Sequence, residues 1–144
     1  MTRDEIRAIE HDLHATMMRF FLYLDAHDGE AAAKLFTPDA EWRAQRGPAV
    51  KGPKGVAANI SGRPKGYVSR HCLANFVVDV ADANNARSQG YVMVYGVDGG
   101  AEPAKLPVQL GLPRSILHYH DRFVRTPEGW RIAEQWSDRV FTSV

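Results

Sequence analysis

The sequence predicts an α+β domain in which helices come first and a curved antiparallel sheet follows. The first 27 residues carry an apolar stripe with helical spacing, and two short helical segments follow them. From Val68 onward the chain consists of segments rich in β-branched and aromatic residues. Because helices and strands are segregated along the chain, we expect the helices to pack on one face of the sheet.

The N-terminal segment predicts a long helix of about seven turns. Its apolar residues recur at steps of three and four, on one face: Ile6, Ile9, Leu13, Met17, Phe20 and Leu24. Gly29 interrupts this pattern, and "GEAAAKLF" predicts a short second helix that the turn residues of "TPDA" end. After these, "EWRA" predicts a short strand, "RGP" a turn, and "PKGVAANIS" a third short helix with Pro53 at its first position.

Four longer strands are predicted in the second half of the chain. Their sequences are "VSRHCLANFVVDV", "RSQGYVMVYGV", "SILHYHDRFVR" and "WRIAEQWSDRVF". The connections between them are "ADANN", the long "DGGAEPAKLPVQLGLP" and "TPEG". Adjacent strands joined by turns pair antiparallel, so we expect one antiparallel sheet.

Composition restricts the class of protein. We expect a single domain over residues 1–144, because the chain is long enough for one core and has no domain-sized linker. The 18 basic and 17 acidic residues leave a net charge of +1, which argues against nucleic acid or an anionic membrane as a partner. The longest apolar run is too short to span a bilayer. Cys72 is the lone cysteine, so no internal disulfide forms and we expect a cytoplasmic location.

The strand "SRHCLANFVVDV" contains a histidine, His71, that needs a polar partner if it is buried. Asp25 is a candidate, because it follows Phe21 and Leu22 in the last turn of the long helix. Apolar neighbours and the negative end of the helix dipole both raise the pKa of such a carboxyl group unless a donor compensates. If the helix crosses the sheet, Asp25 and His71 meet. The alternative is an exposed Asp25 at a helix end and a core histidine with no catalytic role.

Several segments together resemble the SnoaL-like branch of the NTF2-like superfamily. They are "YLDAHDGEAAAKLFTPDAEW", "VKGPKGV", "SRHCLANFVVDV" and "LHYHDRFVRTPEGWRI", in that order over nearly the whole chain. The resemblance implies a cone, in which a bent antiparallel sheet encloses a pocket that the long N-terminal helix closes. The branch includes scytalone dehydratase, bile acid 7α-dehydratase and lindane dehydrochlorinase. In these enzymes an Asp at the end of the first helix and a His at the start of a long strand form a catalytic dyad, and these positions fall on Asp25 and His71.

The chain departs from these relatives around the dyad. Phe20 stands where the dehydrochlorinase has a Lys and the bile acid enzyme a Tyr, and Leu24 stands where scytalone dehydratase has a Tyr. The second catalytic His of scytalone dehydratase has no clear match, and Asp98 is the nearest position. At the positions where those relatives carry groups that hold or protonate the leaving group, this chain therefore has other residues.

Further residues are candidates for the pocket wall. Strand alternation puts Asn75 on the face of His71 together with Ser69 and Leu73, so Asn75 is either a substrate ligand or a solvent-side residue. Alternation puts His118 and His120 on one face of their strand and Tyr119 on the other. If the face of the two histidines is concave, either of them is a candidate proton donor opposite His71. Three more residues are candidates for positions of the pocket wall that contact the substrate: Phe20, Tyr23 and Trp42.

No cofactor or metal is expected. Two histidines at i and i+2 on a strand can bind a metal, but a third ligand appears only if His71 joins them. "KGPKG" lacks the spacing of a phosphate-binding loop and suits a turn before a helix. Four cationic residues form either a basic rim or a solvated face: Lys51, Lys54, Arg63 and Lys65.

These observations favour a cofactor-independent acid–base lyase or isomerase of the dehydratase type. Its substrate would be a small, largely apolar cyclic molecule, with His71 as the base and Asp25 orienting it. The alternative is a ligand-binding or dimerisation module without catalysis, which Phe20 and Leu24 favour. We also expect a homo-oligomer, a dimer or a trimer, because alternation predicts a dry sheet face opposite His71, formed by Cys72, Ala74, Phe76 and Val78.

Overall fold

The structure, a computed structural model, describes residues 1–43 and 48–143. Three helices precede the long strands: α1 (Arg3–Asp25), α2 (Gly29–Ala33) and α3 (Gly52–Ser61). Two short strands lie among the helices, β1 (Phe36–Arg43) and β2 (Val50–Lys51). Four long strands follow: β3 (Val68–Val80), β4 (Asn85–Val97), β5 (Ser115–Thr126) and β6 (Gly129–Thr142). The predicted α+β class and the four long strands are confirmed.

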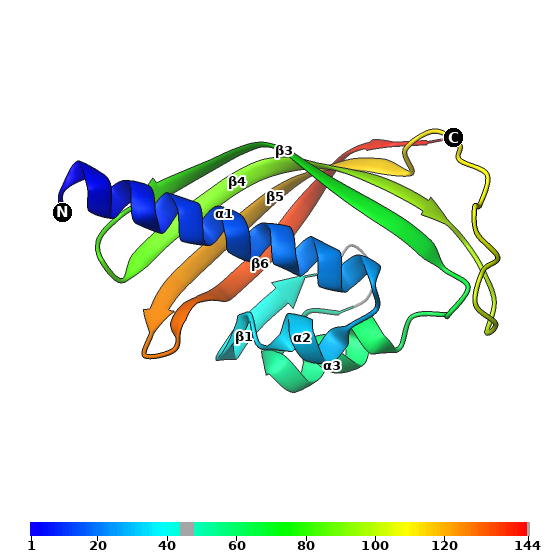
Figure 1. The fold of residues 1–144 in the computed structure, drawn as a ribbon, viewed down its shortest axis with the longest axis horizontal. Helices are drawn as coiled ribbons and strands as arrows, with labels where there is room; N and C mark the ends of the chain where they lie inside the picture. The colour runs from blue at the N-terminus through cyan, green and yellow to red at the C-terminus, as the bar shows by residue number, and fades with distance from the viewer. Residues whose placement is uncertain (44–47, 144) are drawn as a thin grey trace.

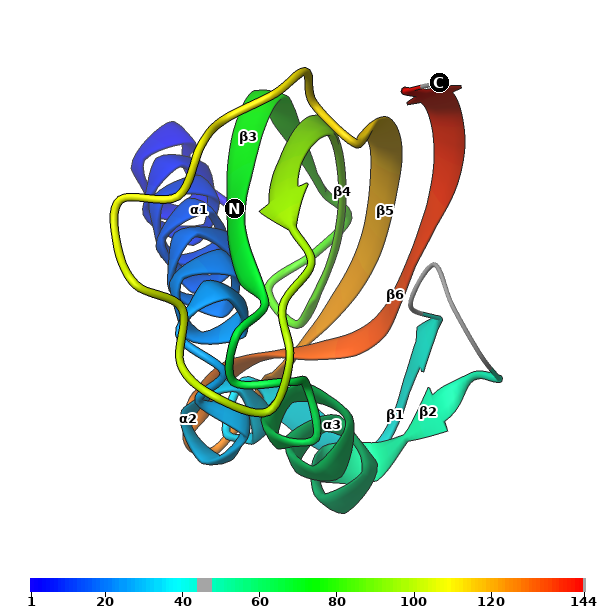
Figure 2. The same ribbon diagram turned by 90° about the vertical axis from the view of Figure 1, so that its right-hand side faces the viewer.

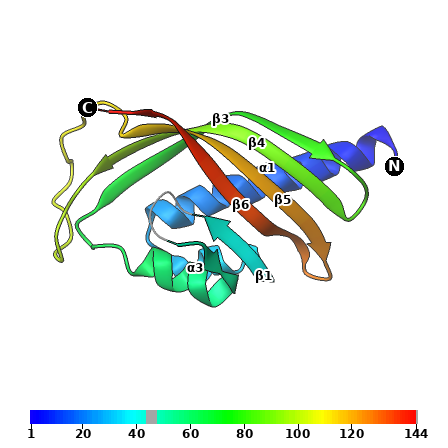
Figure 3. The same cartoon turned by 180° about the vertical axis from the view of Figure 1, so that it is seen from behind.

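All six strands form one curved sheet in the order β2-β1-β6-β5-β4-β3. Figure 1 shows α1 lying along one face of this sheet, with α2 and α3 grouped beside β1. Viewed from the end, the sheet bends around these helices (Figure 2). On the opposite face of β4, β5 and β6, no helix of the described residues packs (Figure 3). The fold is therefore a bent sheet with its helices on the concave side.

Strand β1 differs from the prediction. The sequence suggested a turn at "TPDA", but these residues belong to β1, which pairs parallel to β6. The burial of Phe36, Thr37 and Ala40 explains the difference, because their contacts come from tertiary packing and not from local turn preference. Most of the turn predicted at "RGP" lies outside the described residues.

Helix α1 begins at a capping box and buries one face. The Thr2 side chain accepts a hydrogen bond from the Glu5 backbone N–H, and the Glu5 carboxylate accepts one from the Thr2 backbone N–H. The predicted stripe is buried from Ile9 to Leu24 and packs into the core, and β3 is the strand that α1 contacts most extensively. This packing brings the last turn of α1, with Asp25, against the start of β3.

Strand β3 changes its inward face at Asn75. The pairing with β4 shifts around this residue, whose φ is +50°, so the strand contains a β-bulge. Beyond the bulge Phe76 and Val78 pack against the core instead of standing opposite His71. The dry outer face predicted from unbroken alternation is therefore corrected: Phe76 and Val78 leave it, and Cys72 is exposed.

Within the described residues, no helix is both long enough and apolar enough to cross a membrane.

Candidate active site

A cavity of about 490 Å³ lies between the end of α1, the segment after α3 and the concave face of the sheet. A volume in this range suits a small organic ligand. Its apolar wall is formed by Leu24, Trp42, Val94 and Leu117, and its polar wall includes Arg63, Tyr67, His71, Asp98, Arg114, Tyr119 and Arg139.

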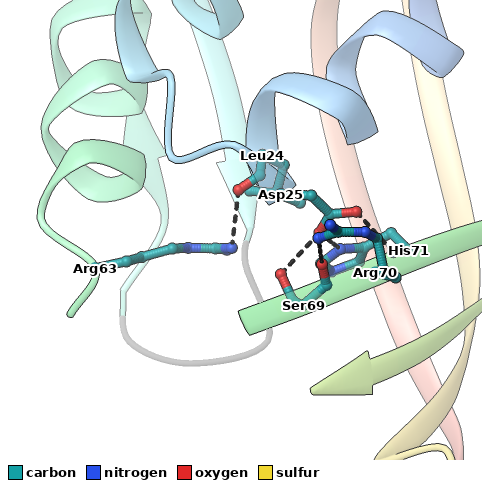
Figure 4. Close-up of polar contacts among 6 residues, drawn as sticks. All are labelled: Leu24, Asp25, Arg63, Ser69, Arg70 and His71. Atoms are coloured by element: carbon teal, nitrogen blue, oxygen red, sulfur yellow. Dashed lines mark hydrogen bonds and ion pairs between the residues drawn. The ribbon is translucent and has the colours of Figure 1, made fainter. Parts of the chain in front are cut away.

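Asp25 and His71 meet at the cavity (Figure 4). The Asp25 Oδ1 lies 2.6 Å from Nδ1 of His71, and Oδ2 accepts a hydrogen bond of 2.9 Å from the His71 backbone N–H. Ser69 donates a further hydrogen bond of 2.7 Å to Oδ1. Both side chains of the pair are largely buried, at 10% exposure for Asp25 and 8% for His71. Strand alternation makes this possible, because Ser69 and His71 face the same side of β3.

The charge state of Asp25 determines the tautomer of His71. Burial by itself raises the pKa of Asp25, but the hydrogen bonds and charge of His71 and the hydrogen bond of Ser69 outweigh it and hold the pKa below its ordinary value. An ionised carboxylate accepts hydrogen bonds only, so the neutral imidazole carries its proton on Nδ1. Nε2 is then left with a lone pair on the cavity side.

Phe21 fixes the plane of the imidazole. Its ring stacks on that of His71 with a centroid distance of 5.6 Å and an interplanar angle of 13°. Phe21 also contacts Tyr119 edge-on, at 5.4 Å. The base candidate is therefore held by a hydrogen bond in its plane and a ring against its face.

Tyr119 carries a second ionisable group at the cavity. Burial, together with the charge of Asp121, raises the pKa of its phenol well above the ordinary value, so the hydroxyl stays protonated at neutral pH. Its side chain also forms a hydrogen bond with Ser137. Tyr119 therefore places a protonated phenol among the residues that line the same cavity as His71.

The structure brings only some of the other predicted residues to the cavity. Trp42 and Tyr119 line it. Phe20 is fully buried in the core, where its ring contacts Phe21, Phe36 and Trp42. Tyr23 packs against the edge of that core, and Asn75 is exposed at the bulge. None of these three residues is among the lining of the cavity.

His118 and His120 lie on the outer face of β5, opposite Tyr119. His118 contacts Gln89 at 3.0 Å, and His120 stacks on Trp136 at 5.1 Å. The expectation that they face the substrate is corrected, because the concave face of β5 belongs to the odd-numbered residues. Among the described residues there is also no group of three or more His, Cys, Asp or Glu side chains that could hold a metal ion.

Sequence reasoning did not assign Arg63, Tyr67 and Arg114 to the cavity. The sequence by itself places Arg63 only in a basic rim or a solvated face. In the structure its side chain lies beside Tyr67, with the guanidinium carbon 6.0 Å from the ring centroid. Arg114 lies at the same distance from the Tyr67 ring. The position of Arg63 eight residues before His71, in the connection that leads into β3, was the available signal.

A model of the SnoaL-like domain matches residues 5–135. The chain belongs to the SnoaL-like family. This confirms the resemblance drawn from the sequence. Among curated proteins, none matches this SnoaL-like chain.

Solved structures share its fold. An NTF2-like protein with a cystatin-like fold from Novosphingobium aromaticivorans has 22% identity and a TM-score of 0.75, over 96% of this chain and 88% of that one. The hexachlorocyclohexane dehydrochlorinase LinA-type3 from Novosphingobium barchaimii has 14% identity and a TM-score of 0.78, over 99% and 93%. ActVI-ORFA from Streptomyces coelicolor has 19% identity and a TM-score of 0.72, over 92% and 98%. At these identities the likeness shows the NTF2-like fold alone.

Proposed function

We propose that this protein is a cofactor-independent lyase or isomerase that performs acid–base chemistry on a small cyclic substrate in the cavity. The observation that carries the proposal is the 2.6 Å contact between Asp25 Oδ1 and His71 Nδ1 at the cavity wall. An imidazole whose Nδ1–H is held by a carboxylate presents Nε2 as a proton acceptor.

In the proposed reaction, Nε2 of His71 removes a proton from a carbon next to a carbonyl or to a carbon that bears a leaving group. The electron pair of the broken C–H bond forms an enolate, or a C=C bond as the leaving group departs. Asp25 stabilises the imidazolium that results. The protonated phenol of Tyr119 is placed to donate a hydrogen bond or a proton to the developing oxygen anion or to a leaving hydroxyl. The imidazolium then returns its proton to the product or to Tyr119.

A relative of the same fold makes elimination chemistry reasonable. The dehydrochlorinase from Novosphingobium barchaimii is named for the removal of hydrogen chloride from a cyclic substrate. Loss of hydrogen chloride from such a ring breaks a C–H bond as well as a C–Cl bond. We carry over only this reaction class, since the cavity of our chain has Leu24 and not a polar group beside Asp25.

Deuterium exchange tests the base without requiring the natural leaving group. The α-protons of a cyclic ketone such as 2-tetralone exchange in D₂O when an enzyme enolises it, and NMR measures the rate. We expect His71→Ala and His71→Gln to lower this rate by about 10²–10⁴-fold, because neither residue accepts a proton at neutral pH. Asp25→Asn should cost less, since it leaves the imidazole in place but favours the wrong tautomer.

The matched control is His118→Ala, which removes a histidine from the outer face of the same sheet. It should leave the exchange rate unchanged. Exchange that persists in His71→Ala would show that another group is the base.

The second candidate function is a ligand-binding module with the same cavity and no catalysis. The apolar side chains of Phe20 and Leu24 favour it, since relatives of the same branch carry polar groups at these positions. In that case 2-tetralone binds wild type and His71→Ala equally, and neither protein accelerates exchange.

A further inference from the structure

Three arginines line the cavity, and they differ in their partners and in their exposure. Arg114 makes two hydrogen bonds to the carboxylate of Asp98, of 2.7 Å and 3.1 Å, so its charge is neutralised locally. Arg63 has no such counter-ion: in residues 1–43 and 48–143 no carboxylate lies within ion-pair distance of its guanidinium. A third arginine, Arg139, stands at the exposed rim, where solvent screens it.

One structural contact of Arg63 is visible in Figure 4. Nη1 donates a hydrogen bond of 3.4 Å to the backbone carbonyl of Leu24, near the end of α1. The last turn of α1 contains no basic residue of its own, so Arg63 supplies a cation at the negative end of that helix. This long hydrogen bond uses one donor of a group that has several, and the others remain available on the cavity side.

The charge of Arg63 is partly desolvated. Burial lowers the pKa of the guanidinium, which nevertheless stays protonated at neutral pH. Its field acts on the neighbouring His27, whose pKa is lowered first by burial and then by the charge of Arg63. The charge of Asp25 acts in the opposite direction and raises the pKa of Arg63, but the two groups form no ion pair. Asp25 is hydrogen-bonded to His71 and Ser69. A partly desolvated cation that forms no ion pair is unfavourable, and an anionic ligand would reduce that cost.

We propose that the ligand of this cavity is a ring compound that carries a carboxylate, and that the guanidinium of Arg63 binds this carboxylate. The inference rests on the proposed function, because it names the substrate class of the same site. A single guanidinium that forms no ion pair within the described residues matches a monoanion, and its planar fork matches the geometry of a carboxylate. The ring would lie against the apolar wall of Leu24, Val94 and Leu117.

This arrangement separates recognition from chemistry. Arg63 enters the cavity from the segment after α3, whereas His71 enters from β3. A carboxylate held by Arg63 therefore orients the ring so that another of its carbons faces Nε2 of His71. Arg63 determines which substrate binds, and His71 determines what happens to it.

A pair of probes of equal shape tests the inference: 2-naphthoate, which carries the carboxylate, and 2-naphthamide, which is neutral. We expect calorimetry to show that wild type binds 2-naphthoate about tenfold more tightly than 2-naphthamide. Arg63→Gln should reduce this preference to about twofold or less while binding of 2-naphthamide persists. Arg63→Lys should keep part of it, because the charge remains but the fork is lost.

Two controls separate this inference from its alternatives. Arg87→Gln removes one positive charge from the exposed side of β4 and should leave the preference intact. His71→Ala should also keep it, although deuterium exchange is lost, so a failure of the base and a failure of anion recognition are distinguishable. Equal binding of both probes to wild type, or a preference that survives Arg63→Gln and disappears in His71→Ala, would overturn the inference. If Arg63 only supports the packing of α1, Arg63→Gln should lower the affinity for both probes equally. The preference for 2-naphthoate over 2-naphthamide would then stay intact, and this result would also contradict the inference.

Discussion

At the scale of single residues, Asp121 shows how a buried carboxyl group makes stability depend on pH. It is 2% exposed and accepts hydrogen bonds from Ser88 (2.6 Å) and Gln135 (2.7 Å). Burial raises its pKa to about 6, against the opposing effect of these two donors. Its position on β5, two residues beyond Tyr119, places it in the core and outside the cavity lining.

The raised pKa sets the direction of the effect. Between about pH 4 and 6 the folded protein holds a proton on Asp121 that the unfolded chain has released, so the contribution of this group to stability falls as pH rises. Asp121→Asn removes the titration and keeps both hydrogen bonds, since the amide accepts from Gln135 and donates to the Ser88 hydroxyl. We expect the free energy of unfolding of wild type, relative to Asp121→Asn, to fall by about 2–3 kcal/mol from pH 4 to 7. Urea unfolding of both proteins at several pH values measures this difference in free energy of unfolding. A difference that stays constant with pH would contradict the raised pKa of Asp121.

At the scale of the elements, the bulge in β3 decides which side chains enter the core. Asn75 adopts a left-handed backbone conformation that Asn and Gly tolerate and β-branched residues do not. The shift in pairing with β4 then directs Phe76 inward, where its ring contacts His14 of α1 at 5.6 Å. His71 and Phe76 both face α1 only because the bulge lies between them.

We expect Asn75→Val to lower the free energy of unfolding by about 1–2 kcal/mol, because a β-branched side chain strains the left-handed conformation. Asn75→Gly should be neutral or slightly stabilising at the same position. Asp79→Val, at an exposed site with ordinary strand geometry, is the matched control and should not destabilise. Urea unfolding compares the three variants, and equal stability of Asn75→Val and wild type would mean that the bulge is not required.

At the scale of the whole molecule, the outer face of the sheet remains the site where we expect copies of the chain to associate. Phe141 is 62% exposed on β6, and Tyr91 is 47% exposed on β4. From Tyr91, ring-to-ring contacts continue through His118 and His120 to Trp136, across β4, β5 and β6. An exposed apolar and aromatic patch of this kind favours burial in an interface.

Light scattering at micromolar concentration should give wild type a mass that is a multiple of 16.1 kDa, as a dimer or a trimer. Charges placed in the patch, Tyr91→Glu with Phe141→Glu, should shift the protein to the monomer mass. The matched control is Leu112→Glu, which changes an exposed leucine in the loop between β4 and β5 and should leave the mass unchanged. A wild-type mass of one chain would contradict the prediction.

The sequence by itself determined the order of helices and strands, the stripe of α1 and the candidates Asp25 and His71. These follow from local periodicity and from residues that stand in a recognisable order. Alternation along β5 also separated Tyr119 from His118 and His120, because neighbouring strand residues point to opposite faces. It did not say which of the two faces is concave, since that depends on the side from which α1 packs.

Only the tertiary structure decided the remaining features. Strand β1 forms by pairing with β6, nearly a hundred residues away, so no local signal marks its start. The bulge at Asn75 adds a residue to the strand, so that the even-numbered side chains beyond it face the core. Phe76 therefore lies at the core and not on the outer face. Arg63 belongs to a connecting segment, and whether a carboxylate of the described residues forms an ion pair with it depends on its neighbours in space. Long-range packing sets all three features, whereas sequence periodicity records only the local preference of each segment.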